Sequence, residues 1–248
     1  MKIGLVGLPK SGKTTLFNLL TGSTIPTSRF DGGRAELHTG VARVPDARVD
    51  RLSALFSPKK TTYATFEVVD LAGIEKGGRG PLDTKEFRNA DALLHVVRAF
   101  TDEARGAAAP RRDIIDLETE LILADLEVVD RRLERLEQSI KKRRVDSEVA
   151  EQTVLTRLKT TLESETPLRA AGLGADDARI VRGFTFLSQK PILHCVNLSE
   201  KDVGEGSRVV ERFGLAEVAA RPETRVGWVS AVIRELGGPL KPLPGVQL

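Results

Sequence analysis

Short apolar runs alternate with amphipathic stretches along most of the chain. The runs are rich in β-branched residues, which predicts buried strands, and the amphipathic stretches repeat apolar residues at helical spacing, which predicts helices. Strands alternating with helices favour an α/β fold in which helices flank a largely parallel sheet. We expect strands at residues 3–6, 39–44, 62–69, 91–98, 191–196 and 225–229, and helices at 13–20, 45–55, 176–187 and from about 231.

The middle of the chain follows a different period. Its apolar residues are spaced four and three apart and are flanked by Glu and Arg, which is typical of a heptad seam. A second helical run follows, with Leu155, Leu158 and Leu162 on one face. We expect an antiparallel coiled-coil hairpin; the alternative is a pair of ordinary amphipathic helices packed on the core. The seam residues are Ile122, Leu126, Val129, Leu133, Leu136 and Ile140.

This change of period divides the chain into four parts. The α/β pattern occupies residues 1–112 and returns at 166–240, so the helical hairpin, 113–165, is predicted to be an insertion between two strands. Residues 241–248 contain two prolines and are expected to form a tail.

Composition narrows the class of protein. Hydrophobic residues make up 40% of the 248 residues and charged residues 29%, which is ordinary for a globular protein, and a net charge of +3 does not by itself indicate nucleic acid. The single cysteine, Cys195, excludes an intrachain disulfide and is interpreted as a core residue. The scatter of the three histidines suggests no metal cluster. No apolar run is long enough for a membrane span, so we expect a cytoplasmic protein.

The loop after the first predicted strand carries the strongest chemical motif. Its sequence, GLPKSGKT, runs from Gly7 to Thr14 and fits the phosphate-binding pattern G-x-x-x-x-G-K-[ST], with a strand before it and a helix after it. Glycines allow successive N–H groups to converge on phosphate oxygens, and the helix directs its positive end at the same anion. Lys13 is predicted to reach the β- and γ-phosphates, and the Thr14 hydroxyl to ligate Mg²⁺.

A second motif, DLAG, ends the predicted strand at 62–69. The Asp70 carboxylate is predicted to hold Mg²⁺, directly or through water, and the Gly73 amide to contact the γ-phosphate. Asp-x-x-Gly is also a common turn, so its position after a P-loop and an extended strand decides the interpretation.

The sequence NLSE, residues 197–200, follows the strand predicted at 191–196. GTPases place N-K-x-D here, and the Asp accepts two hydrogen bonds from guanine. Leu198 and Glu200 replace the Lys and the Asp, and the extra methylene moves the carboxylate by about 1.5 Å. A site built for buried hydrogen bonds discriminates strongly against a ligand that cannot make them. The shifted carboxylate therefore disfavours guanine and favours adenine, whose donor and acceptor suit the Asn197 amide. The alternative is an ordinary helix cap.

Together these motifs resemble the Obg-like ATPase, or YchF, family of P-loop GTPases in the translation-factor class. The resemblance covers nearly the whole chain and includes GLPKSGKTTLFNLLTG, VPDARVDRLSALFSPKK, DLAGIEKG, DALLHVVRAF, ETELILADLEVVDRRLERLE and NLSE. It implies a G-domain with an inserted hairpin, binding of ATP or GTP with Mg²⁺, slow hydrolysis and association with the ribosome. Ile74 stands where other GTPases have a water-positioning Gln, which implies low intrinsic turnover.

The chain also departs from the family pattern. The family's switch I Thr falls on Ala35, which cannot ligate Mg²⁺, and the segment from Asp70 to Asp91 is shorter by about five residues. Lys10 and Ser11 replace Asn and Val in the phosphate loop. The family's C-terminal TGS domain is absent from this sequence.

We therefore predict a slow, Mg²⁺-dependent ATP or GTP hydrolase. The alternatives are a nucleotide-binding module that does not hydrolyse, and an interaction platform whose hairpin contacts a partner. The predicted catalytic residues are Lys13, Thr14, Asp70 and Gly73. The predicted nucleotide-binding residues are Pro9, Lys10, Ser11, Gly12, Lys13, Thr14, Thr15, Asn197, Leu198, Glu200, Ser230 and Ala231.

Overall fold

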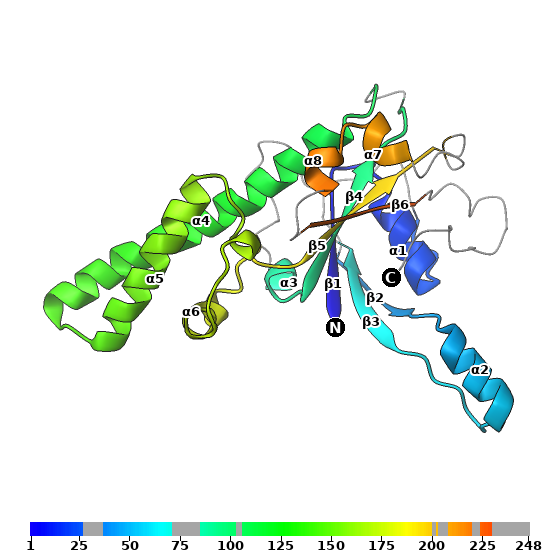
Figure 1. Ribbon diagram of the computed structural model, residues 1–248, viewed down its shortest axis with the longest axis horizontal. Helices are drawn as coiled ribbons and strands as arrows, with labels where there is room; N and C mark the ends of the chain where they lie inside the picture. The colour runs from blue at the N-terminus through cyan, green and yellow to red at the C-terminus, as the bar shows by residue number, and fades with distance from the viewer. Residues whose placement is uncertain are drawn as a thin grey trace.

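The structure, a computed structural model, is built on a six-stranded sheet of order β2-β3-β1-β4-β5-β6 (Figure 1). It describes residues 1–26, 37–70, 85–102, 106–199, 202, 208–219 and 224–229. Only β2 runs antiparallel to its neighbour, β3, so the prediction of a largely parallel α/β sheet is confirmed. The strands are β1 (Lys2–Val6), β2 (His38–Arg43), β3 (Thr65–Asp70), β4 (Ala92–Arg98), β5 (Ile192–Asn197) and β6 (Thr224–Val229).

Helices cover both faces of this sheet. Successive side chains of a strand point to opposite faces, so Leu5 of β1 packs with Phe17 of α1, whereas Val6 packs with Leu117 and Leu121 of α4. The helices are α1 (Lys13–Thr21), α2 (Ala47–Phe56), α3 (Lys85–Arg88), α4 (Pro110–Lys142), α5 (Asp146–Glu163), α6 (Ala175–Val181), α7 (Val209–Arg212) and α8 (Ala216–Ala219), with 3-10 helices η2 (Leu168–Ala170) and η3 (Arg182–Phe184).

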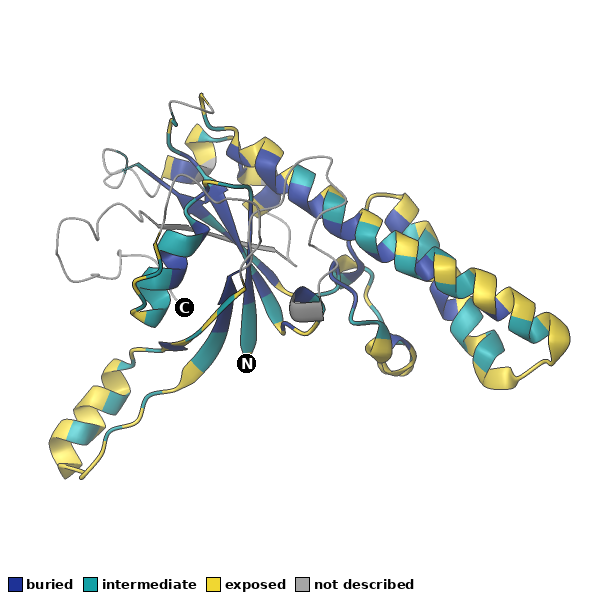
Figure 2. Cartoon of the chain, turned by 180° about the vertical axis from the view of Figure 1, so that it is seen from behind, coloured by how far each residue is buried: buried dark blue, intermediate teal, exposed yellow. Residues whose placement is uncertain are grey.

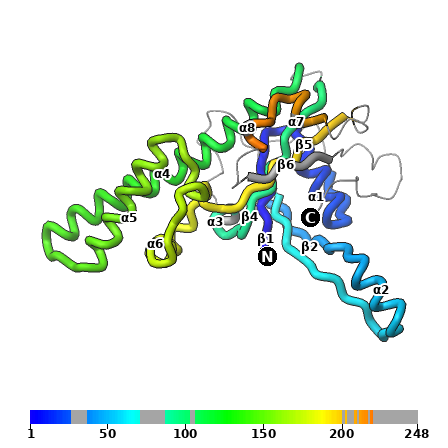
Figure 3. The backbone as a smooth tube through the Cα atoms, viewed as in Figure 1, coloured from blue at the N-terminus to red at the C-terminus, as the bar shows by residue number. Residues whose placement is uncertain are grey.

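The predicted hairpin is formed by α4 and α5, which lie side by side between β4 and β5 in the chain (Figure 3). The first turns of α4 pack on the sheet, and the rest of the helix extends away from it beside α5. Val129 and Leu136 of the heptad seam are fully buried against α5 residues that include Leu155, Leu158 and Leu162. The seam of α4 therefore packs against a second helix of the same chain, as its spacing predicted. The exact limits of the inserted domain stay a prediction.

The helix expected at 176–187 is shorter than predicted. Helix α6 ends at Val181, and after η3 the chain turns at Thr185, where φ is 50°. The backbone N–H groups of Leu187 and Ser188 then donate to the Asp125 carboxylate of α4, at 2.9 and 2.7 Å. These tertiary hydrogen bonds replace the last helical turn.

Helix α2 extends from the sheet edge on the side away from the hairpin, and most of its surface is exposed (Figure 2). None of its residues is buried, and Leu55 and Phe56 are 73% and 72% exposed. The Tyr63 hydroxyl, on the returning segment, donates to the Asp50 carboxylate of the helix. Polar contacts within this region, rather than a hydrophobic core, hold its shape.

Within the described ranges, no helix is both long and apolar enough to cross a membrane.

Candidate functional site

The phosphate loop turns at two glycines that no other residue would replace without strain. Gly7 has a φ of 147°, and a Cβ atom there would lie 2.5 Å from the carbonyl oxygen of Val96. Gly12 has a φ of 97°, and its Cβ would lie 2.4 Å from the Asn197 side-chain nitrogen. Both positions need positive φ and close backbone approach, so the motif glycines are required by this fold.

Helix α1 begins directly after this loop, at Lys13. Its N-cap residue, Gly12, makes no side-chain hydrogen bond to the helix, so the cap does not compete with an anion for the first backbone N–H groups. Pro9 and Thr15 are partly buried on either side of the turn, and the Ser11 N–H donates to Leu8 O at 3.2 Å. Lys10 is exposed and adopts a left-handed conformation with a φ of 62°.

Lys13 is held inside the loop. Its side chain is only 6% exposed, and Nζ donates to Leu8 O at 3.1 Å, which folds the ammonium back over the turn. A lysine cation at this position suits a phosphate bound by the same loop, and the contact that the motif predicts stays a prediction.

The two predicted Mg²⁺ ligands come together, although they lie 56 residues apart in the chain. The Thr14 hydroxyl donates to Asp70 Oδ2 at 2.8 Å. Burial raises the pKa of Asp70, against the opposing effects of the Thr14 hydrogen bond and the Lys13 charge. Its Oδ1 is buried and has no hydrogen-bond partner within the described chain.

This pair fits Mg²⁺, which prefers oxygen ligands and is typically held by one or two protein side chains together with substrate phosphates and water. No group of three or more His, Cys, Asp or Glu side chains gathers at a metal-binding distance in the described residues. A site of this kind would therefore depend on the nucleotide to complete its coordination.

Asn197 contacts the phosphate loop itself. It is 2% exposed at the end of β5, and its Nδ2 donates to Ser11 O at 3.0 Å. Leu198 is 1% exposed and packs with apolar residues such as Val196 and Leu215, so its side chain belongs to the core. Asn197 thus braces the loop in addition to any contact with a base, a role that the sequence reading did not assign.

Several predicted residues lie outside the described part of the chain. They are Ala35, Gly73, Ile74, Glu200, Ser230 and Ala231. Their predicted roles at the γ-phosphate, the attacking water and the base stay predictions.

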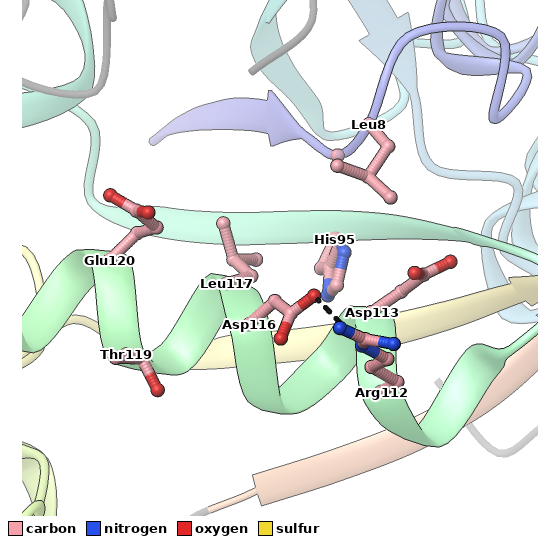
Figure 4. Close-up of a pocket in the computed structure, with 9 residues that line it drawn as sticks. Leu8, His95, Arg112, Asp113, Asp116, Leu117, Thr119 and Glu120 are labelled. Atoms are coloured by element: carbon pink, nitrogen blue, oxygen red, sulfur yellow. Dashed lines mark ion pairs between the residues drawn. The ribbon is translucent and has the colours of Figure 1, made fainter. Parts of the chain in front are cut away.

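Sequence reasoning missed a buried histidine pair. His95 of β4 and His194 of β5 are aligned in register, and their Nδ1 atoms lie 2.9 Å apart, although 99 residues separate them. His95 also lines a cavity of about 270 Å³ between the phosphate loop and α4, with Leu8 and Asp113 among the other lining residues (Figure 4). Thr14 and Asp70 do not line this cavity, so it is separate from the predicted nucleotide position. The one sequence signal for this pair is that each histidine occupies an inward-facing position of a predicted buried strand.

The buried pair predicts a pH-dependent stability. Burial holds the pKa of His95 well below its ordinary 6.5, and the neighbouring His194 and Lys13 act in the same direction. Below pH 6.5 the unfolded chain therefore binds a proton at this position that the folded chain does not, so the unfolding free energy falls as the pH decreases towards the folded pKa. The contribution of His95 has a slope of at most about 1.4 kcal/mol per pH unit.

Urea unfolding between pH 7.5 and 5.5 measures this slope. We expect a His95→Asn variant to lose less stability over this range than the original chain. The same pH dependence in both proteins would show that His95 does not carry the effect.

Comparison with known proteins identifies the family. A sequence model of the family described as "50S ribosome-binding GTPase" matches residues 2–145. The ribosome-binding ATPase YchF of Bacillus subtilis (strain 168) is 36% identical over 239 residues, which cover 93% of this chain and 65% of the relative. Obg-like ATPase 1 of Oryza sativa subsp. indica is 34% identical over 211 residues, covering 82% of this chain and 54% of the relative.

A solved structure shows the same fold. The YchF GTPase of Schizosaccharomyces pombe superposes with a TM-score of 0.76 and 25% sequence identity, over 95% of this chain and 67% of that one. The chain thus spans less than two thirds of the length of the curated relatives named above, 65% of the B. subtilis protein and 54% of the O. sativa protein. It belongs to the 50S ribosome-binding GTPase family, and its resemblance to the YchF and Obg-like ATPases of that family is confirmed.

Proposed function

We propose that the chain is a Mg²⁺-dependent nucleotide switch that binds ATP or GTP and hydrolyses it slowly. The contact between Thr14 and Asp70, 2.8 Å long and next to the buried Lys13, carries this proposal. It brings a hydroxyl, a carboxylate and an ammonium to one end of the sheet, which is the set that P-loop enzymes use on the β- and γ-phosphates.

Thr14 and Asp70 are the residues that would hold Mg²⁺. When bound, the ion neutralises charge that develops on the phosphate oxygens during transfer. Lys13 and the open N–H groups of α1 would orient the same phosphates, and Asn197 would keep the loop in its binding conformation through Ser11 O. The chain's own contribution is therefore mainly positioning and electrostatic stabilisation.

Slow turnover follows from residues that the chain lacks. Ile74 offers no hydrogen bond to an attacking water, and Ala35 supplies no hydroxyl to the metal. The alternative, a module that binds without hydrolysing, rests on Ala35 and on the short segment from Asp70 to Asp91.

The proposed partner is the ribosome, in the cytoplasm. Relatives from B. subtilis and E. coli O157:H7 are named ribosome-binding ATPases, and the hairpin of α4 and α5 offers an extended exposed surface for such a contact (Figure 2). In the alternative of an interaction platform, the hairpin still contacts the ribosome, and the bound nucleotide only stabilises the fold.

The nucleotide preference has a direct test. Calorimetric titration with Mg-ATP and Mg-GTP is expected to show tighter ATP binding, because Glu200 is one methylene too long for the paired guanine contact. A Glu200→Asp variant restores the shorter carboxylate and should gain about tenfold in GTP affinity, the value of about one charged hydrogen bond.

The titration tests base recognition and the P-loop assignment separately. Tighter GTP binding by the original chain would remove the base-recognition argument and leave the P-loop assignment intact. Binding of neither nucleotide would remove the proposed function.

A further inference from the structure

A row of buried polar side chains crosses the α4 face of the sheet. His95, His194 and Glu118 are 1%, 0% and 6% exposed. The two histidines are joined through their Nδ1 atoms at 2.9 Å, and His194 Nε2 lies 3.4 Å from Glu118 Oε1. The other carboxylate oxygen of Glu118 pairs with Arg169 of η2. Four side chains from β4, β5, α4 and η2 therefore form one continuous series.

The Glu118 carboxylate sets the charge in the middle of this series. Burial opposes the charged form of Glu118, but the contacts with His194 and Arg169 outweigh it and lower the pKa, so Glu118 is a carboxylate. At 3.4 Å, His194 Nε2 and Glu118 Oε1 face each other as an ion contact, and neither atom has a hydrogen-bond partner within the described residues. The Nδ1 atoms of His95 and His194 share one hydrogen, which one ring donates and the other accepts.

The first end of the series lies against the phosphate loop. His95 pairs in register with Val6, the residue before Gly7, and its ring lines the same cavity as Gly7 and Leu8 (Figure 4). The next residue of β4, Val96, places its carbonyl oxygen where a Cβ on Gly7 would be. A movement of this loop therefore reaches His95 directly.

The second end lies at the base of the hairpin, where α5 returns to the sheet. Arg169 Nη1 donates to Ser188 O at 3.2 Å, and the Leu168 N–H donates to Ser188 Oγ at 3.3 Å. Ser188 N–H in turn donates to Asp125 of α4. Arg169 and Ser188 thus join η2, the segment before β5 and α4 at one point.

We propose that this series, with His194 as its positioning residue, couples nucleotide binding at the phosphate loop to the attachment of the hairpin base. The inference rests on the proposed function. Buried polar contacts resist lengthening, because a stretched hydrogen bond leaves a donor or acceptor unpaired and a lengthened ion contact leaves a buried charge less compensated, in each case without water. Ordering of the loop by phosphate then stabilises each contact as far as Arg169.

Hydrogen exchange of the backbone amides tests the coupling. In the original chain, saturating Mg-ATP is expected to slow exchange at Leu168, Arg169, Leu187 and Ser188 by about fivefold or more, the usual lower range of coupling between sites. A His194→Leu variant should bind Mg-ATP with unchanged affinity but lose this slowing. A His194→Gln variant, which offers both a donor and an acceptor, should recover part of it.

The amide of Val154, in the middle of α5, serves as an internal control that the nucleotide should not change. Slowing that persists in His194→Leu, or that never occurs although calorimetry shows binding, would overturn the coupling alone. Failure of the original chain to bind Mg-ATP would overturn the proposed function, and the coupling with it.

Discussion

Replacing Lys13 by alanine is expected to lower the affinity for Mg-ATP by about a hundredfold and to abolish phosphate release in a single turnover. Lys13 is almost fully buried in the loop, and its ammonium donates to Leu8 O. A charge-assisted hydrogen bond contributes about 1.5–3 kcal/mol, and about 2.7 kcal/mol corresponds to a hundredfold change in affinity.

Lys10 provides the matched control, because it is a second cation in the same loop. Its side chain is exposed, so Lys10→Ala should change the affinity much less than Lys13→Ala does. Equal losses in the two variants would mean that only the overall charge of the loop matters. No Lys13-dependent phosphate release from the original chain, despite binding, would favour the non-hydrolysing module.

The largest expected effect on stability is at Asp125. This carboxylate is 0% exposed, accepts hydrogen bonds from the N–H groups of Leu187 and Ser188, and lies 3.6 Å from the Arg88 guanidinium. Asp125→Ala leaves two buried backbone donors without their acceptor and removes the carboxylate beside a largely buried cation. We expect a loss of about 3–5 kcal/mol in the free energy of unfolding, measured by urea denaturation.

Two substitutions calibrate this result. Asp125→Asn keeps one acceptor oxygen and should lose less stability than alanine. Asp130→Ala, on the same helix, removes an exposed ion pair with Lys159 and should cost less than about 1 kcal/mol. If Asp125→Ala costs no more than Asp130→Ala, the carboxylate does not anchor the segment before β5.

The elements that the sequence predicted well are those whose pattern is local. The seam spacing of α4 identified Val129 and Leu136 as buried, because a helix places residues three and four apart on one face. The turns of the phosphate loop were predictable because its glycines meet a local backbone requirement, whereas the roles of its lysine and threonine toward a nucleotide stay predictions.

The features that the sequence did not predict depend on distant contacts. The helix expected up to Leu187 ends early because Asp125, 62 residues earlier in the chain, binds its backbone. The histidine pair depends on the register of β4 and β5, and no local pattern encodes register between strands. Asn197 was assigned to the base alone because the sequence does not show how closely β5 approaches Gly12.

The isolation of α2 gives the molecule two independent spectroscopic reporters. The only tyrosine, Tyr63, bonds to Asp50 of α2, and the only tryptophan, Trp228, lies in β6 of the sheet. Because no residue of α2 is buried, opening of this region exposes little apolar surface and is only weakly coupled to unfolding of the sheet. Tyrosine and tryptophan fluorescence therefore follow different transitions, and the melting curve of one does not describe the other.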